Sequence, residues 1–130
     1  MGGGGSTSIG ASGAGFAVTH GGPSGAKLIR LDLDGRRTAT DVSIGGSPAK
    51  LVWTGTRYAF AWSAPDGPVF LATIDPTATA PSAPVPVSSP SAVAAVNAVA
   101  LVWNGDGYGV VWSDSRTGTS ETHFAVVCPP

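Results

Sequence analysis

The chain has 130 residues, of which 42% are hydrophobic and 12% charged, and its formal net charge is −1. This near-neutral balance provides no basic surface for nucleic acid or anionic lipid, so we expect neither a nucleic-acid nor a membrane partner. The 19 glycines and 11 prolines interrupt any long helix and favour an all-β fold of short strands joined by turns. The single cysteine, Cys128, excludes an internal disulfide framework.

The N-terminal residues 1–5 are a methionine followed by four glycines, which is typical of a flexible linker. They lack the basic and apolar parts of a signal peptide, and no apolar run is long enough to span a bilayer. We therefore predict a flexible segment at 1–5 and one repeat domain at 6–130. The chain is either complete or a piece of a longer exported protein.

The first unit of the domain, about 6–46, is a degenerate repeat. Moved forward by 44 positions, residues 6–19 lie on 50–63, with Ile9 at Trp53, Phe16 at Phe60 and Val18 at Trp62. This alignment predicts a hairpin. Residues 26–32 alternate as a third strand, and an Asp-Gly turn at 32–36 leads into a fourth strand at 38–43.

Two later segments, 51–63 and 101–113, share the pattern L-V-W-x-G-x-x-Y-x-x-x-W-S, fifty positions apart. Such self-similarity indicates a repeat protein. Each copy predicts a hairpin with its aromatic residues on one face, and we expect these to be buried: Trp53, Tyr58, Trp62, Trp103, Tyr108 and Trp112. The opposite face is small, with Ala59 and Ala61 in one copy and Gly109 and Val111 in the other. It leaves room for aromatic side chains of a neighbouring layer, so both faces of each hairpin should be buried.

The second unit, about 47–90, should contain strands at 51–53, 58–63 and 69–74, and a proline-weakened edge strand at 84–88. The third unit, about 91–130, should contain strands at 99–103, 108–113 and 121–127 and lack a fourth. Four antiparallel strands per unit is the pattern of a β-propeller blade. The expected fold is thus an all-β partial propeller of about three blades, the first degenerate and the third lacking its last strand.

The two copies, with the turn at 114–118 and the strand at 121–125, resemble the W-x-G-x-x-Y-x-x-x-W-x-D repeats of bacterial propellers, especially those of myxobacteria. Many of these proteins are secreted or lie on the cell surface. The resemblance implies a propeller fold and an extracellular or cell-surface location. It implies no single activity, because propellers host hydrolases, lectins and protein-binding platforms alike.

Two acidic turns are candidate functional sites. Residues 113–118 are similar to the Asp-box hairpin of sialidase-like propellers, but an Asp at a bend that accepts backbone N–H groups explains them as a turn. Asp32 and Asp34 have the opening spacing of a calcium loop, yet no later ligand or closing Glu follows Gly35. We predict turns at both places, with no metal and no cofactor.

Catalytic constellations are also incomplete. His20 and His123 are the only imidazoles, and they occupy non-equivalent positions in their units. No serine-centred motif occurs, Cys128 lies near the end of the chain, and Glu121 is the only glutamate, so no nucleophile–base–acid set converges. We predict a chain with no catalytic residues.

The expected function is therefore a non-catalytic binding or structural module, with a glycan or protein ligand at the loops of the blades. The alternative is a fragment of a sialidase-like or other glycan-acting propeller hydrolase. Since closed propellers have at least four blades, three units predict either a homodimer that makes a six-bladed ring or a poorly soluble fragment.

Overall fold

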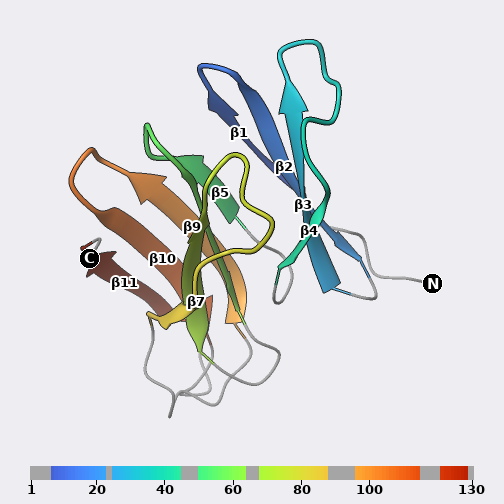
Figure 1. Cartoon of the computed structure of the whole chain (residues 1–130). Helices are drawn as coiled ribbons and strands as arrows, with labels where there is room; N and C mark the ends of the chain where they lie inside the picture. The colour runs from blue at the N-terminus through green and yellow to red at the C-terminus, as the bar shows by residue number, and fades with distance from the viewer. Residues whose placement is uncertain are drawn as a thin grey trace.

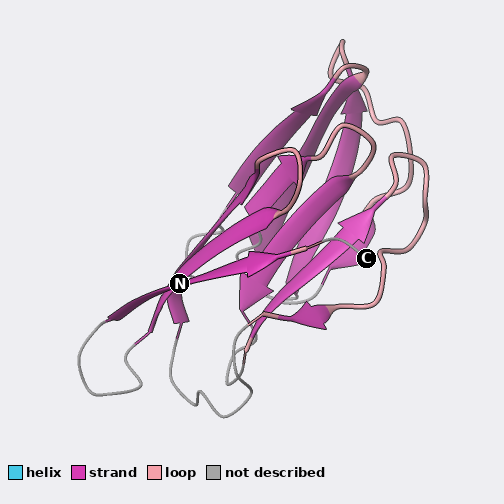
Figure 2. Cartoon of the chain, turned by 90° about the vertical axis from the view of Figure 1, so that its left-hand side faces the viewer, coloured by secondary structure: helices cyan, strands magenta, loops and turns pink. Residues whose placement is uncertain are grey.

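The computed structural model describes residues 7–22, 25–44, 50–63, 68–87, 96–114 and 121–128. These residues form three antiparallel sheets and contain no helix (Figures 1 and 2), which confirms the expected all-β fold. The sheets have four, four and three strands in chain order. The first sheet contains β1 (Thr7–Ser12), β2 (Gly15–Gly22), β3 (Gly25–Asp32) and β4 (Val42–Ile44); the second contains β5 (Lys50–Trp53), β6 (Tyr58–Ser63), β7 (Val69–Ile74) and β8 (Val85–Pro86); the third contains β9 (Val96–Trp103), β10 (Tyr108–Asp114) and β11 (Glu121–Val127). The glycine-rich segment at 1–5 lies outside the described residues.

The predicted strand positions are largely confirmed, and the two fourth strands are shorter than predicted. β4 begins at Val42 rather than at residue 38. Arg37 forms an isolated bridge with Leu31, and the N–H of Thr38 donates to Arg30 O at 3.0 Å, but the regular pairing with β3 resumes only at 42–44. β8 consists of Val85 and Pro86 alone. A proline at this edge has no N–H to donate, which keeps the pairing short.

The glycine shared by the two copies occupies a turn that only glycine adopts readily. Gly55 has a φ of 102° and Gly105 a φ of 101°, a region in which a side chain would be strained. The residue before each glycine closes the turn through its side chain: Thr54 Oγ1 accepts from the N–H of Arg57 at 3.3 Å, and Asn104 Oδ1 accepts from the N–H of Gly107 at 2.9 Å. The repeated sequence therefore builds the same hairpin twice.

The three sheets lie side by side in chain order, with the second between the other two (Figure 1). Neighbouring sheets come closest along their first strands, β1 against β5 and β5 against β9. One hydrogen bond joins the first pair, from the N–H of Leu51 to Ser8 Oγ at 3.2 Å. The sheets thus approach one another at one side, where each begins.

Two apolar cores fill the spaces between the sheets. The first interface packs Ala17, Ala26, Leu28, Val42 and Ile44 of the first sheet against Leu51, Tyr58, Phe60, Trp62, Ala72 and Ile74 of the second. The second interface packs Ala59, Ala61, Val69 and Leu71 of the second sheet against Val99, Leu101, Tyr108, Val110 and Trp112 of the third. Each core joins the small face of one sheet to the large face of the next, as close packing requires.

The aromatic prediction is confirmed for four of the six residues. Tyr58, Trp62, Tyr108 and Trp112 are buried, whereas Trp53 and Trp103 are half-buried against the edges of the two cores. Each of these two indoles lies 4.7 Å from the ring of the tyrosine across its hairpin. They lie next to the turn, where the neighbouring sheet covers them only in part.

The prediction that both faces of each hairpin are buried holds for the second sheet only. Ala59 and Ala61 are fully buried beneath the third sheet. In the third sheet the corresponding face is open, because Val111 is 36% exposed and Gly109 is only half-buried. The described residues therefore form a row of sheets that does not close on itself.

Strand pairing corrects the alignment of the degenerate first unit. Ile9 pairs with Val18 in the first sheet, as Leu51 pairs with Phe60 in the second. Val18 therefore corresponds to Phe60 and not to Trp62, two residues from the predicted match. The faces are unchanged by this shift, since side chains alternate with a period of two.

A pocket between the second and third sheets

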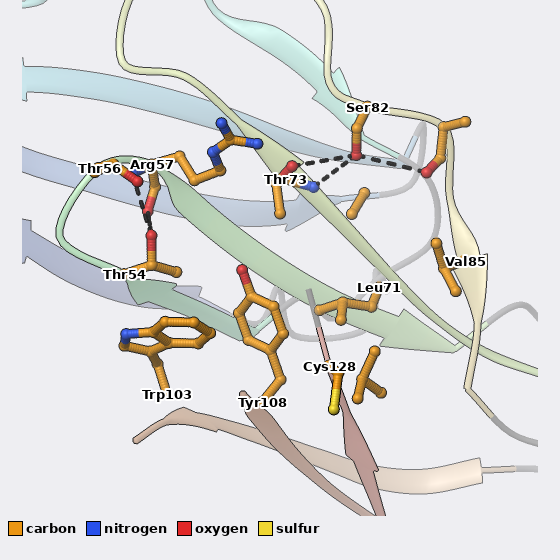
Figure 3. A pocket seen from close by; sticks show the side chains of 13 residues that line it. Thr54, Thr56, Arg57, Leu71, Thr73, Ser82, Val85, Trp103, Tyr108 and Cys128 are labelled. Carbon is orange, nitrogen blue, oxygen red and sulfur yellow. Dashed lines mark hydrogen bonds between the residues drawn. The ribbon is translucent and has the colours of Figure 1, made fainter. Parts of the chain in front are cut away.

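A pocket of about 910 Å³ opens between the second and third sheets, at the end where β5 turns into β6 and β11 ends (Figure 3). Both sheets and the turn at 54–57 contribute to it. Its lining consists of Thr54, Thr56, Arg57, Leu71, Ala72, Thr73, Ser82, Ala83, Val85, Trp103, Tyr108, Val127 and Cys128.

One wall of the pocket is aromatic. The rings of Trp103 and Tyr108 lie 4.7 Å apart at 51°, and the hydroxyl of Tyr108 points into the pocket (Figure 3). No described residue forms a hydrogen bond with that hydroxyl. Burial raises the pKa of Tyr108, and the cation of Arg57 partly opposes the shift. The pocket therefore presents the phenol of Tyr108 in its neutral form.

The opposite wall is polar. Arg57 Nε lies 3.6 Å from Asp75 Oδ1, and because both side chains are at least half exposed this ion pair holds the guanidinium only weakly. Ser82 Oγ accepts from the N–H of Thr73 at 2.9 Å, which fixes a hydroxyl at the outer edge of the pocket. A ligand would meet an aromatic surface on one side and a cation with hydroxyl groups on the other.

The first interface shows why the pocket exists. Arg30 on β3 pairs with Ala17, and Thr73 on β7 pairs with Ala59, so Arg30 and Thr73 occupy the same place in their sheets. Arg30 is only 2% exposed. Its side chain fills a space between the first and second sheets that corresponds to the pocket beside Thr73 between the second and third sheets. The shorter threonine leaves that space open in the second interface.

Arg30 is held by main-chain oxygens of the segments that follow β3 and β7. Its Nη1 donates to the carbonyl oxygens of Asp75 at 3.1 Å and Pro76 at 2.9 Å, and its Nη2 donates to Thr40 O at 3.1 Å. Burial lowers the pKa of Arg30, and Tyr58 and Asp41 act in the opposite direction. The guanidinium therefore ties the first sheet to the turn that follows β7.

The sequence considerations missed both Arg30 and Thr73. A signal was present, because Arg30 follows Ala26 and Leu28 at alternate positions and so shares their buried face. A cation on such a face must find acceptors within the protein. The pocket itself had no signal in the sequence, since it depends on which residue of the preceding sheet faces it.

The acidic turn considered as a calcium loop is a hairpin turn. Asp32 Oδ1 accepts from the N–H of Asp34 and from the N–H of Arg36, both at 2.9 Å, and Gly35 has a φ of 82°. The carboxylate of Asp32 is therefore used within the turn. Within the described ranges no group of three or more His, Cys, Asp or Glu side chains gathers as metal ligands would.

The two histidines lie in different sheets. His20 is exposed near the end of β2, whereas His123 on β11 stacks on Trp112 with ring centroids 5.7 Å apart. Phe70 packs on Trp62 at 5.6 Å across the equivalent strand pair. His123 thus occupies a packing position that is filled by a phenylalanine in the second sheet.

Of the remaining residues considered, only Cys128 reaches the pocket. It lines the outer edge, and its thiol is exposed. Glu121 lies 3.8 Å from His123 Nε2, away from the pocket lining. Residues 115–120 of the turn that is similar to an Asp box lie outside the described residues. Among the described residues, those that line the pocket include no carboxylate or imidazole.

Comparison with known proteins found no protein-family model, no curated protein and no solved structure that matches the chain. The described residues also contain no helix with the length and apolar character needed to cross a membrane.

Proposed function

We propose that this chain is a non-catalytic binding module of the β-propeller type, located outside the cell or on its surface. Three features support the propeller interpretation: four strands in each of the first two sheets, sheets that come closest along their first strands, and the repeated W-x-G-x-x-Y hairpin. Blades of a propeller converge on their axis in this way. The location follows from the resemblance of the repeats to secreted and surface propellers.

The pocket between the second and third sheets is the observation that carries the binding function. Its volume of about 910 Å³ lies within the range of small-molecule sites, which combine an apolar surface with a few polar groups. A sugar ring has a matching character, with an apolar face for Trp103 and hydroxyl groups for Tyr108 and Arg57. We therefore take a carbohydrate of one or two residues as the ligand.

The alternative of a glycan-acting hydrolase receives no support from this pocket. Glycoside hydrolysis uses paired carboxylates that flank the scissile bond, and no carboxylate is found among the described residues that line the pocket. Binding without turnover is the function that these groups favour.

The test uses the difference between the two interfaces. Thr73→Met should fill the pocket without adding a charge, and Thr73→Arg should place a guanidinium there as Arg30 does in the first interface. Thr73→Ser is the matched control, because it keeps the hydroxyl and the space. On a glycan array, we expect the wild-type chain and Thr73→Ser to bind one sugar class and both filling variants to lose at least 90% of that signal, an effect of roughly 1.4 kcal/mol or more.

The single thiol provides a second readout. Because Cys128 lies at the edge of the pocket, bound sugar should slow its alkylation by a maleimide, and no other cysteine competes for the reagent. Sugar binding that persists in both filling variants, with no protection of Cys128, would place the ligand elsewhere. Binding of peptides but of no sugar on matched arrays would replace the carbohydrate with a protein ligand.

A further inference from the structure

The row of sheets ends in two apolar faces that are exposed in the single chain. On the third sheet, Val102, Phe124 and Val126 are 60%, 63% and 66% exposed, and Val111 lies among them. On the opposite side of the first sheet, Ile9 is 65% exposed. We call these the third-sheet outer face (Val102, Gly109, Val111, Phe124, Val126) and the first-sheet outer face (Ile9, Phe16, Val18, Ile29, Leu31).

The third-sheet outer face repeats a face that is covered elsewhere in the same chain. Gly109 pairs with Val102 as Ala59 pairs with Val52, so the face around Gly109 corresponds to the face of the second sheet that the third sheet buries. The side chains of Val102 and Phe124 close over Gly109, because a Cβ atom there would lie 3.1 Å from Val102 Cγ2 and 3.4 Å from Phe124 Cε2. The result is a continuous apolar face on which another sheet can pack.

The first-sheet outer face has apolar side chains at positions that pack between sheets elsewhere in the chain. The pairing of β1 with β2 places Phe16 at the position of Tyr58 and Val18 at that of Phe60. Tyr58 and Phe60 are the residues through which the second sheet packs on the small face of the first. Phe16 and Val18 are partly exposed, and no further sheet of the chain covers their face in the described residues (Figure 1).

We propose that the first-sheet outer face of one copy packs on the third-sheet outer face of a second copy, and that two copies close a ring of six sheets. The new contact joins two exposed apolar faces whose counterparts pack on one another between the sheets of the single chain. A two-fold rotation makes the contact twice and leaves no open end. This assembly goes beyond the proposed ligand binding, because neither face contributes to the pocket.

The test is the mass of the full chain by sedimentation, without ligand. A monomer has a mass of 12.8 kDa, and we expect the wild-type chain at micromolar concentration to have twice that mass. The ring contains the contact twice, and Phe124→Lys or Ile9→Lys places a charge in each of the two contacts. Each variant should therefore be a monomer, with half the mass of the wild-type dimer. Leu33→Lys is the matched control, since Leu33 is equally exposed, at 66%, but lies in the turn after β3; it should remain a dimer.

Mixing the two monomeric variants separates this arrangement from other dimers. A mixed pair keeps one unaltered contact, formed by the third sheet of the Ile9→Lys chain and the first sheet of the Phe124→Lys chain, so dimers should reappear. A wild-type monomer would overturn the proposal. So would a dimer that Phe124→Lys breaks and Ile9→Lys does not, because it would join two third sheets. Far-ultraviolet circular dichroism of each variant shows whether a monomer is folded.

Discussion

The two interfaces of this chain pack similar hairpins on one another and differ at the position that Arg30 and Thr73 occupy. In the first, the buried guanidinium of Arg30 fills the space beside Ala17 and binds carbonyl oxygens of the segments that follow β3 and β7. In the second, Thr73 stands at the equivalent place and a pocket remains beside Tyr108. The shared hairpin pattern therefore accompanies the same packing of sheet on sheet, whereas the residue that differs leaves open space in the second interface only.

The largest expected effects concern what the interfaces share. Trp62 and Trp112 occupy equivalent positions in the first and second cores, so Trp62→Ala and Trp112→Ala should each lower the free energy of unfolding by about 3–5 kcal/mol. Urea unfolding followed by circular dichroism measures both. A loss below about 1 kcal/mol for either variant would mean that its interface is not a packed core.

The next effect concerns where the interfaces differ. Arg30→Ala leaves three carbonyl oxygens without their donor. A hydrogen bond to a charged group contributes about 1.5–3 kcal/mol to stability, and the three contributions do not add in full because they share one guanidinium. We expect a loss of about 3 kcal/mol for Arg30→Ala and at most about 0.5 kcal/mol for Thr73→Ala. Arg30→Met keeps most of the volume and separates packing from hydrogen bonding. Equal losses for Arg30→Ala and Thr73→Ala would show that Arg30 contributes no more to the first interface than Thr73 does to the second.

Sequence reasoning predicted the parts of this fold that depend on local pattern. The alternation of Tyr58, Phe60 and Trp62 placed β6 correctly, and the small face of Ala59 and Ala61 predicted a covering layer before any neighbour was known. The position of a strand and the direction of its side chains follow from a period of two. Such features need no knowledge of the partner sheet.

The same reasoning failed where the answer depends on a distant element. The first unit was aligned two residues away from its true register, because without its tryptophans only the pairing of Ile9 with Val18 sets the match. The burial of Arg30 depends on carbonyl oxygens of Asp75 and Pro76, which lie in the next unit. Long-range contacts of this kind leave no periodic trace in one sequence.

A smaller effect is expected at the two repeated turns, which lie on either side of the second interface. Gly55→Ala and Gly105→Ala each force a side chain into a left-handed conformation, at a cost of about 1–2 kcal/mol, and nothing lies within 4 Å of the added Cβ in either case. The two losses should therefore be equal. Thr56→Ala, in the same turn as Gly55, should stay within about 0.5 kcal/mol of the wild-type chain. Urea unfolding of the three variants decides, and unequal glycine losses would mean that the turns differ more than their φ angles indicate.

The smallest effect should appear only in alkali, and only at the second interface. Burial raises the pKa of Tyr108 above its ordinary value, which is about 10, so the folded state favours the neutral phenol. Below the pKa of the unfolded chain this contribution to stability is fully present, because both states are protonated. As the pH rises through the folded pKa the contribution is lost, since the unfolded chain ionises first. Tyr108→Phe cannot ionise, so its free energy of unfolding should fall less than that of the wild-type chain between about pH 9 and pH 11. Arg57→Met removes the cation that opposes the pKa shift of Tyr108. The stability of this variant should therefore fall more steeply with pH than that of the wild-type chain. If Tyr108→Phe and the wild-type chain lose the same stability over this range, the phenol faces open solvent, and the pocket is wider at Tyr108 than its lining residues indicate.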